Sequence, residues 1–156
     1  MRLRQLQPID YDAIISVLNR WWGGRHVSDM LPKLFFNHFH PTSWVIEAEN
    51  RPIAFLVGFI SPGEPEESYI HFVGIHPEYR RQGLGRRLYQ AFFQTASDHG
   101  CRRVRCLTSP INKRSIAFHR SLGFQLVPSQ TVEEDLPIHK DYDGPGRDRV
   151  LFVKEL

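Results

Sequence analysis

The segment from Ile75 to Gly85 carries the side chains best suited to bind a phosphate-bearing ligand. It reads Ile75-His76-Pro77-Glu78-Tyr79-Arg80-Arg81-Gln82-Gly83-Leu84-Gly85, with an apolar run before it and a long amphipathic pattern after it. Glycines let the backbone approach a ligand closely, and successive N–H groups at the start of a helix attract an anion. The arginines add positive charge. The segment therefore predicts a pyrophosphate-binding turn between a strand and a helix.

This turn differs from the two best-known nucleotide-binding loops. A Walker A loop requires a Gly-Lys-Ser/Thr sequence, which the segment lacks. A Rossmann fingerprint requires a Gly-x-Gly-x-x-Gly frame in an early βαβ unit, and Gly83 and Gly85 stand outside such a frame. We therefore expect another small polyanionic ligand at this turn.

A second pattern lies downstream and reads Asn112-Lys113-Arg114-Ser115-Ile116-Ala117-Phe118-His119-Arg120-Ser121-Leu122-Gly123-Phe124. Asn112 is a favourable helix N-cap, and Gly123 is a favourable stop. The two patterns together resemble the GNAT superfamily of N-acetyltransferases, whose coenzyme A signature, Arg/Gln-x-x-Gly-x-Gly/Ala, is matched by Arg80–Gly85. The resemblance extends over the whole domain in the order of its elements.

The resemblance implies a set of contacts to acetyl-CoA. The strand before the turn would pair with the pantetheine arm through its backbone, amides of the turn would hold the pyrophosphate, and the second motif would line the thioester region. The residues implied are Val73, Gly74, Ile75, Arg80, Arg81, Gln82, Gly83, Leu84, Gly85, Arg86, Asn112, Ser115 and Phe118. Many family members have a tyrosine that protonates the leaving thiolate where this chain has His119, so we expect His119 to be the acid.

Two residues compete for the role of general base. Side chains alternate along a strand, so we expect His71 to lie on the same face as Val73 and Ile75, beside the cofactor. Some relatives in the family carry histidines here as a base relay, and an imidazole changes its charge near neutral pH. The alternatives are that His71 is only a hydrogen-bonded residue of the sheet, or that Glu67 at the mouth of the strand is the base.

The resemblance also implies where the amine binds. The segment Trp21-Trp22-Gly23-Gly24-Arg25-His26 would form a wall of the acceptor pocket. Two adjacent tryptophans on one helix cannot both face the core, so one should be buried while the other, for which we take Trp22, faces the acceptor. Arg25 would hold a remote carboxylate or phosphate, unless it is merely exposed. Tyr142, within a long acidic loop, would frame the opposite side.

The apolar periodicity predicts the elements that position these residues. Expected strands cover residues 3–6, 44–48, 53–60, 69–75, 104–107, 124–127 and 150–153, and expected helices begin at Asp10, Ser28, Leu84 and Asn112. The strand at 53–60 is apolar on both faces and should be central. The order predicts an α/β fold with a single-domain mixed, largely antiparallel sheet and helices on both faces, over residues 1–156. The resemblance adds that the sheet is splayed at the cofactor-binding strand.

Composition limits the other classes of function. The chain has a formal net charge of +3, and its arginines cluster around the glycine turn, which favours a small polyanion over nucleic acid. No apolar run approaches the length of a membrane span. Two cysteines without an export signal indicate reduced thiols and a cytoplasmic protein. The spacing of His139, Asp141 and Asp143 lacks a firm metal scaffold, so we expect no metal.

These observations predict an acyl-CoA-dependent N-acyltransferase that moves an acetyl group from acetyl-CoA to a primary amine through a tetrahedral intermediate. The acceptor would be a small-molecule amine or a peptide amine, and its remote end would carry an anion or an aromatic group. The alternative is a non-catalytic acyl-CoA-binding sensor, which the histidine at position 119 keeps open. A homodimer is one of the oligomeric states left open.

Overall fold

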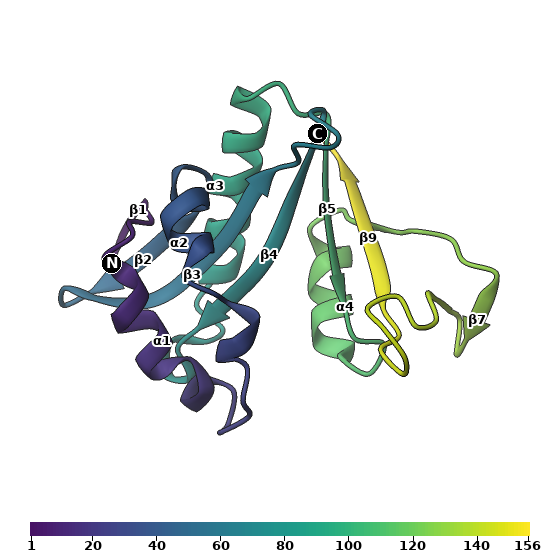
Figure 1. The fold of residues 1–156 in the computed structure, drawn as a ribbon, viewed down its shortest axis with the longest axis horizontal. Helices are drawn as coiled ribbons and strands as arrows, with labels where there is room; N and C mark the ends of the chain where they lie inside the picture. Colours follow the sequence, from purple (N-terminus) through teal and green to yellow (C-terminus); the bar gives the residue numbers. More distant parts are fainter.

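A computed structural model describes residues 1–156. Most strands form one seven-stranded sheet, and a separate two-stranded hairpin extends from it (Figure 1). The strands are β1 Arg2–Gln5, β2 Trp44–Ala48, β3 Arg51–Ile60, β4 Glu67–Ile75, β5 Arg103–Thr108, β6 Gln125–Leu126, β7 Thr131–Glu133, β8 Leu136–Ile138 and β9 Val150–Glu155. The helices are α1 Asp10–Trp21, α2 Leu34–Phe39, α3 Leu84–Asp98 and α4 Lys113–Ser121, with short 3-10 turns η1 Ser28–Met30, η2 His40–Thr42 and η3 Pro77–Tyr79.

The sheet is split between its fourth and fifth strands. Its order is β1-β2-β3-β4-β5-β9-β6, and the β4–β5 pair is parallel whereas every other pair is antiparallel. β4 and β5 pair only over three positions, the last of which joins Tyr69 to Arg105. Beyond it the two strands diverge into a V (Figure 1). The expected mixed, largely antiparallel and splayed sheet is confirmed.

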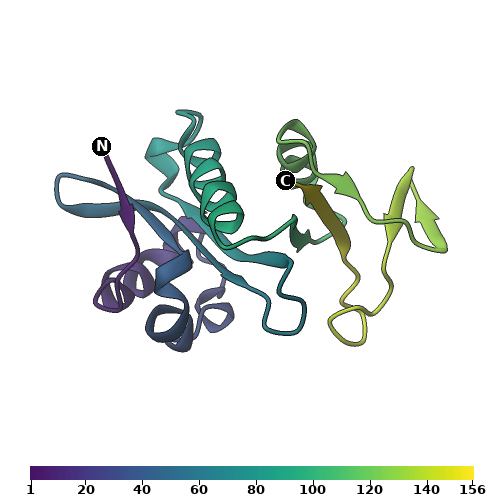
Figure 2. The same cartoon turned by 90° about the horizontal axis from the view of Figure 1, so that it is seen from above.

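Two apolar clusters cover the two faces of this sheet. The larger one lies under α3 and α4 and contains Phe92 and Phe152, both fully buried. The smaller one lies under α1 and α2 and contains Phe36 and Phe55, also fully buried. Figure 2 shows the helices on either side of the sheet. Burying each of these phenyl rings stabilises the fold by roughly 1.5–3 kcal/mol, so both helix layers are held firmly to the sheet.

A β-bulge at His71 changes which face the β4 side chains occupy. Val57 pairs with Phe72 and Gly58 with Ile70, so His71 has no partner on β3. An extra residue of this kind interrupts strict alternation. The His71 ring stacks on Phe35 of α2 at 4.1 Å between ring centroids. By contrast, Val73 and Ile75 pack against the cluster under α3 and α4. The expectation that His71 shares their face was therefore wrong.

The segment between α1 and β2 also differs from the expected single helix. Ser28 opens only a 3-10 turn, and Leu31 has φ −130° and ψ 66°, because a residue before proline avoids the helical region. A new helix, α2, starts at Leu34. Its buried residue is Phe36, whereas Leu34 is 47% exposed. Pro32 thus separates η1 from α2.

The other element predictions agree with the structure apart from short shifts at their ends. The long loop after β6 contains the β7–β8 hairpin, which Figure 2 shows extending away from the main sheet. No helix has the length and apolar character needed to cross a membrane.

Candidate functional site

The turn between β4 and α3 presents a run of free backbone donors. The N–H groups from Arg81 to Arg86 donate no hydrogen bond to the protein, and the next N–H, of Arg87, bonds to the Gly83 carbonyl at 3.1 Å. Arg81 and Gly83 both have positive φ, at 63° and 77°. Alternation of this kind turns successive N–H groups to one side and forms a concave anion site. These N–H groups are therefore suited to bind a pyrophosphate, because no hydrogen bond within the protein has to break first.

Three glycines lie near this turn, and a different physical reason favours glycine at each position. A Cβ at Gly83 would meet nothing within 4 Å, so this glycine is favoured by its positive φ and leaves open space above the free donors. A Cβ at Gly85 would lie 3.2 Å from Phe118, because α3 begins close to α4. A Cβ at Gly74 would lie 2.4 Å from the Phe55 ring, so this residue is set by core packing. Gly83 and Gly85 both contribute N–H groups to the free donors, but only Gly83 leaves open space above them.

The arginines of the turn differ in whether the protein itself already binds their side chains. Arg80 donates from Nη2 to the Trp21 carbonyl at 2.8 Å, which ties the turn to the end of α1. Its guanidinium therefore holds the turn in place. Arg86 reaches Ser121 at 3.4 Å, and Arg81 has no side-chain partner. Arg81 and Arg86 are the exposed charges nearest the free donors.

The open edge of β4 provides main-chain groups along the splay. The His76 N–H bonds to the Ile53 carbonyl on β3 at 2.8 Å. Because successive residues point their polar groups to opposite edges, those of Val73 and Ile75 face the splay. No strand covers them, because β5 has already diverged. This edge is suited to bind an extended chain such as a pantetheine arm.

The second motif forms the start of α4 on the other side of the splay. The Asn112 side chain accepts a hydrogen bond from the Ser115 N–H at 3.2 Å, as predicted for an N-cap. Phe118 is half-buried, and its ring packs on Tyr89 of α3 with centroids 5.2 Å apart. Phe118 and Gly85 thus bring the starts of α3 and α4 together below the splay.

His71 lies on the α1–α2 face near the apex of the splay. Its Nε2 is 2.6 Å from the Met30 carbonyl, and a carbonyl only accepts, so Nε2 carries the proton. Nδ1 then holds the free lone pair and has no partner in the protein. Burial lowers the pKa of His71, although the bond to Met30 opposes this. The ring is therefore neutral at pH 7, with a basic nitrogen available.

Glu67 lies at the closed end of the splay. Its Oε1 accepts from Arg105 Nε at 2.9 Å and from Arg103 Nη1 at 3.5 Å. These contacts join β4 to β5 where the two strands still pair. Such a doubly paired carboxylate is poorly placed to take a proton from an amine.

His119 lies in the core, away from any open surface. It is 6% exposed and stacks on Phe152 with centroids 4.6 Å apart. Nδ1 donates to the Ser115 carbonyl at 2.7 Å, and Nε2 accepts from the Tyr89 hydroxyl at 2.8 Å. Burial lowers its pKa, so the ring stays neutral. Both nitrogens are occupied, so no free ring nitrogen supports the acid role expected for His119.

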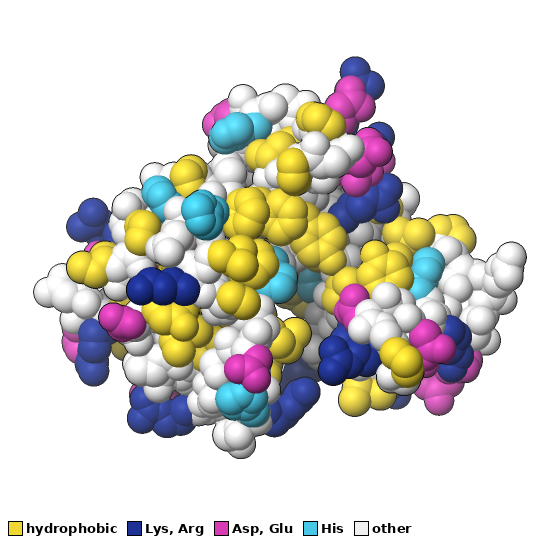
Figure 3. Space-filling model, viewed as in Figure 1, with side chains coloured by type: hydrophobic (Ala, Val, Ile, Leu, Met, Phe, Trp, Pro, Cys, Tyr) yellow, Lys and Arg dark blue, Asp and Glu magenta, His cyan; other side chains and the backbone are white.

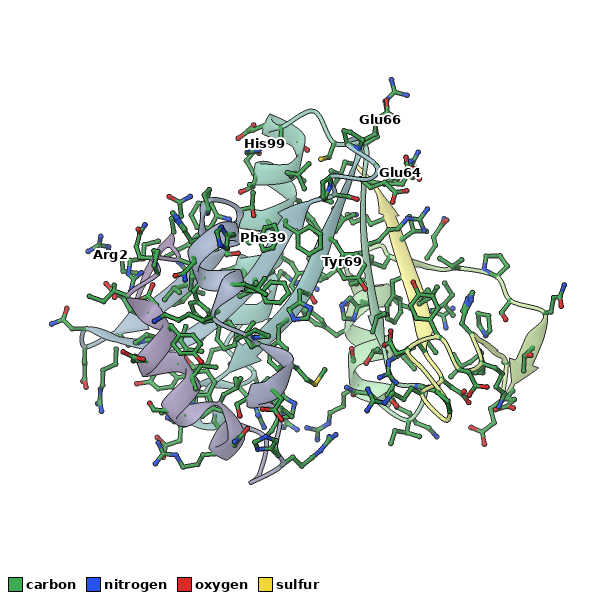
Figure 4. All side chains as sticks on the ribbon, in the orientation of Figure 1. Arg2, Phe39, Glu64, Glu66, Tyr69 and His99 are labelled. Atoms are coloured by element: carbon green, nitrogen blue, oxygen red, sulfur yellow. The ribbon has the colours of Figure 1, made fainter.

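Tyr69 is a candidate that the sequence prediction missed. It is the last β4 residue paired with β5, and Figure 4 shows it at the gap between the two strands. Its hydroxyl has no hydrogen-bond partner. Burial raises its pKa, and the neighbouring Cys106, Tyr142 and Asp143 add to the rise, so the hydroxyl keeps its proton. The signal that could have identified Tyr69 is its position two residues before His71 on the same strand.

Comparison with known proteins identifies the family. The profile of the acetyltransferase (GNAT) family matches residues 11–124, which is well over half of the chain. The chain belongs to the GNAT family.

Named relatives of this GNAT protein acetylate amines. It is 30% identical over 90 residues to L-2,4-diaminobutyric acid acetyltransferase of Nocardia farcinica, covering 58% of this chain and 47% of that protein. It is 33% identical over 57 residues to thialysine N-epsilon-acetyltransferase of Bos taurus, covering 36% and 34%. The chain thus spans about half the length, or less, of these curated relatives.

The fold matches that of a solved GNAT enzyme with both ligands. Diaminobutyrate acetyltransferase from Paenibacillus lautus, in complex with 2,4-diaminobutyric acid and coenzyme A, superposes with a TM-score of 0.71 at 18% identity. The match covers 97% of this chain and 92% of that one. At this identity the likeness establishes the shared fold.

The loop after α1, expected to line the acceptor pocket, is shaped by Asn19, which the sequence prediction did not include. Its Oδ1 accepts from the N–H groups of Val27 and Ser28 at 2.8 and 2.9 Å, which holds the loop after α1. Trp21 is the buried tryptophan, at 4% exposure. Trp22 packs on Phe72 at 5.2 Å, on the face that carries His71. Arg25 is exposed and has no ion-pair partner.

The loop after the β7–β8 hairpin contains Tyr142, which was expected to frame the opposite side of the acceptor. Tyr142 is 52% exposed, and Asp143 accepts from Arg149 at 2.8 Å. Asp141 accepts from the Gly146 N–H at 2.7 Å, so its carboxylate closes the loop on itself. The loop is therefore internally ordered, with Tyr142 presented at its surface.

One groove of this GNAT protein lies outside the splay. It has a volume of about 680 Å³ and lies between α1, the β2–β3 turn and η3. Trp21, His76 and Tyr79 form its aromatic part. It borders the anion turn from the far side, and none of the expected catalytic side chains enters it.

Proposed function

We propose that this GNAT protein transfers an acetyl group from acetyl-CoA to a primary amine by direct attack. The observation that carries the proposal is the run of unbonded N–H groups from Arg81 to Arg86, at the mouth of the open β4 edge. The pyrophosphate would lie on these donors and the pantetheine arm along Val73 and Ile75. Acetyl-CoA supplies the thioester, and the chain's own groups position and deprotonate the amine.

The proposed base is Nδ1 of His71. The amine must lose its proton to attack, and the neutral ring offers a lone pair while Met30 fixes its tautomer. As the C–N bond forms, the amine proton passes to Nδ1 and then to solvent. A backbone N–H on the open β4 edge would stabilise the oxyanion, because such donors are already oriented before the reaction.

The proposed donor to the leaving thiolate is Tyr69. Collapse of the intermediate breaks the C–S bond, and the sulfur leaves as a thiolate that accepts a hydrogen bond or a proton. Tyr69 lies at the apex with its hydroxyl unbonded and protonated. A thiol with a pKa near 8.5 leaves well even without help, so this contribution should be modest.

The proposed class of acceptor rests on the substrates of the named relatives and on the side chains expected to line the acceptor pocket. Both named relatives act on primary amines, diaminobutyric acid and thialysine, which supports an amine acceptor here. Trp22, Arg25 and Tyr142 would contact it from two sides. We also propose a cytoplasmic protein, because both thiols are buried and free, and a homodimer as the oligomer to test first.

The test is a screen of small amines and short peptides with acetyl-CoA, with release of free coenzyme A thiol as the readout. We expect amine-dependent thiol release and a mass increase of the amine corresponding to one acetyl group. Absence of both, in a protein that coenzyme A does not stabilise against heat, would refute the proposal.

The second candidate function is an acyl-CoA sensor without turnover. The burial of His119 favours it, because the position of the family's usual acid is occupied by a core residue. A sensor would show thermal stabilisation by acetyl-CoA but no thiol release with any amine. Amine-dependent turnover would eliminate it.

A further inference from the structure

A continuous set of aromatic side chains lies beside the proposed base, and we name it the aromatic shelf. Its members are Phe35 and Phe39 of α2, Phe59 of β3, and Tyr69 and His71 of β4. All five are half-buried, so each keeps part of its ring at the surface. Figure 3 shows hydrophobic side chains as a yellow band across this front face. Figure 4 shows Phe39 and Tyr69 on the same side of the sheet.

The rings of the shelf contact one another in sequence from the base to the splay. Phe35 stacks on His71 with centroids 4.1 Å apart and lies 5.6 Å from Phe39. Phe39 lies 4.8 Å from Phe59, and Phe59 stacks on Tyr69 at 5.7 Å. The shelf therefore begins at the nitrogen proposed to take the amine proton and ends at the apex of the splay.

The shelf carries no net charge and offers no partner for an ionic group. Burial keeps His71 neutral, and the raised pKa of Tyr69 keeps it protonated. Two cations beside Tyr69 are already paired, Arg105 with Glu67 at 2.9 Å and Arg149 with Asp143 at 2.8 Å. A carboxylate on the acceptor would lose its hydration here without gaining a free cation.

We infer that the acceptor is an aromatic primary amine with a short linker, whose ring lies on the aromatic shelf while its nitrogen lies at His71. This inference rests on the proposed acetyl transfer. An aryl ring gains offset or edge contacts from several shelf members at once, beyond what its buried area provides. Diaminobutyrate and lysine-like acceptors lack such a ring and carry a carboxylate that the shelf does not neutralise.

The experiment compares four acceptors with acetyl-CoA: 2-phenylethylamine, 2-cyclohexylethylamine, 2,4-diaminobutyrate and a short peptide with a free N-terminus. We expect kcat/KM for 2-phenylethylamine to exceed that for the cyclohexyl analogue several-fold, and that for diaminobutyrate by about tenfold or more. The pair of variants Phe39→Leu and Phe59→Leu keeps the apolar volume but removes the aromatic faces. It should reduce the preference over the cyclohexyl analogue to near one.

A matched control is Phe93→Leu, which removes a half-buried ring on α3 that packs against the opposite cluster. It should leave the aryl preference unchanged. In parallel, binding of 2-phenylethylamine to the protein loaded with coenzyme A is followed by NMR shifts. Binding lost in Phe39→Leu but kept in Phe93→Leu supports the shelf even if turnover is absent, in which case the transferase proposal alone fails.

Two results would overturn the inference while leaving the transferase intact. One is turnover of diaminobutyrate or of the peptide at least as fast as that of the aryl amine. The other is an aryl preference that survives in Phe39→Leu and Phe59→Leu. Loss of diaminobutyrate activity in Arg25→Ala would then assign recognition to that exposed arginine instead.

Discussion

The chemistry of His71 depends on where its two nitrogens point. Met30 accepts from Nε2, which leaves Nδ1 as the basic atom, and stacking on Phe35 fixes the plane of the ring. His119 shows the opposite arrangement, with both nitrogens bonded inside the core. The same residue type is therefore a candidate base at one position and a structural group at the other.

Replacing His71 by Gln should lower kcat/KM by about 10²–10⁴-fold, the usual size of a general-base contribution. The Gln amide can still donate to the Met30 carbonyl, so the fold should be kept. In the unaltered protein kcat/KM should fall as the pH drops through the lowered pKa of His71, because the protonated ring cannot accept the amine proton. The measurement is a pH profile of kcat/KM for both proteins, in which the variant should lack this acid limb.

Two controls accompany this profile. His99→Gln replaces an exposed histidine at the end of α3 and should change nothing. Glu67→Gln removes the carboxylate paired with Arg105 and should leave the acid limb in place. If instead the limb disappears in Glu67→Gln and persists in His71→Gln, Glu67 is the base.

Tyr69→Phe should lower kcat several-fold with little change in KM for the amine, because a hydroxyl that contacts only the departing thiolate acts in the transition state. The ring and its stacking on Phe59 are retained. The ratio of kcat values is measured with acetyl-CoA and with an acyl donor whose thiol has a lower pKa. The deficit should shrink with the better leaving group, and an equal deficit with both donors would remove Tyr69 from this role.

His119→Phe should affect stability more than activity. It leaves the Tyr89 hydroxyl and the Ser115 carbonyl buried without their partner, which costs about 1–3 kcal/mol for an unsatisfied group. Adding Tyr89→Phe should recover part of that loss. Urea unfolding measures the stabilities, and kcat/KM per folded molecule should stay within a few-fold. A loss of a hundredfold or more in a well-folded variant would restore His119 as a catalytic residue.

At the scale of elements, the strand–turn–helix from β4 to α3 forms the proposed anion site. The end of β4 supplies an unpaired edge, the turn supplies unbonded N–H groups, and the Arg80 bond to Trp21 holds the turn against α1. None of these features depends on a titrating side chain. Cofactor binding should therefore be governed by backbone conformation.

Gly83→Ala should weaken coenzyme A binding by about tenfold or more, since a left-handed backbone costs alanine roughly 1–2 kcal/mol and its Cβ would enter the open space above the donors. Gly100→Ala is the matched control, because Gly100 also has positive φ, at 82°, and open surroundings, at the other end of α3. Both variants should lose similar stability. The thermal shift produced by coenzyme A measures binding, and equal shifts in the two variants would remove Gly83 from the cofactor site.

At the scale of the whole molecule, the splay divides the sheet into two halves that share only a short parallel pairing. Glu67 bridges them through Arg103 and Arg105, and α3 meets α4 below through Gly85 and Phe118. Two neutral histidines lie on the two sides of this join, His71 above β4 and His119 beneath β9. Low pH should therefore destabilise both halves of the sheet, because each half contains one of these histidines.

The free energy of unfolding should fall as the pH drops below about 6.5, the pKa of histidine in an unfolded chain. Burial lowers the folded pKa of both histidines, so in this range the unfolded chain binds protons that the folded chain does not. Each histidine contributes a slope of at most about 1.4 kcal/mol per pH unit, ending below its folded pKa. Urea titrations at pH 7.5 and 5.5 measure the change. The His71→Gln, His119→Gln double variant should flatten it, and an unaltered slope would contradict this origin.

The sequence alone determined the strand–turn–helix, because glycine and capping preferences act locally. Asn112 caps α4 and Gly83 opens α3 as their residue types require. The order of elements followed from apolar periodicity for the same reason. Pro32, which a helix starting at Ser28 was expected to tolerate in its first turn, instead separates η1 from α2.

Only the tertiary structure decided the roles of the polar side chains. The bulge at His71 arises from the pairing register with β3, and that register places the ring on the α1–α2 face instead of the face that Val73 and Ile75 occupy. The burial of His119 depends on how α3, α4 and β9 meet, which no local pattern encodes. Tyr69 gained its place because β4 and β5 separate directly after it. Contacts between residues distant in the chain set these environments, and so they set the chemistry.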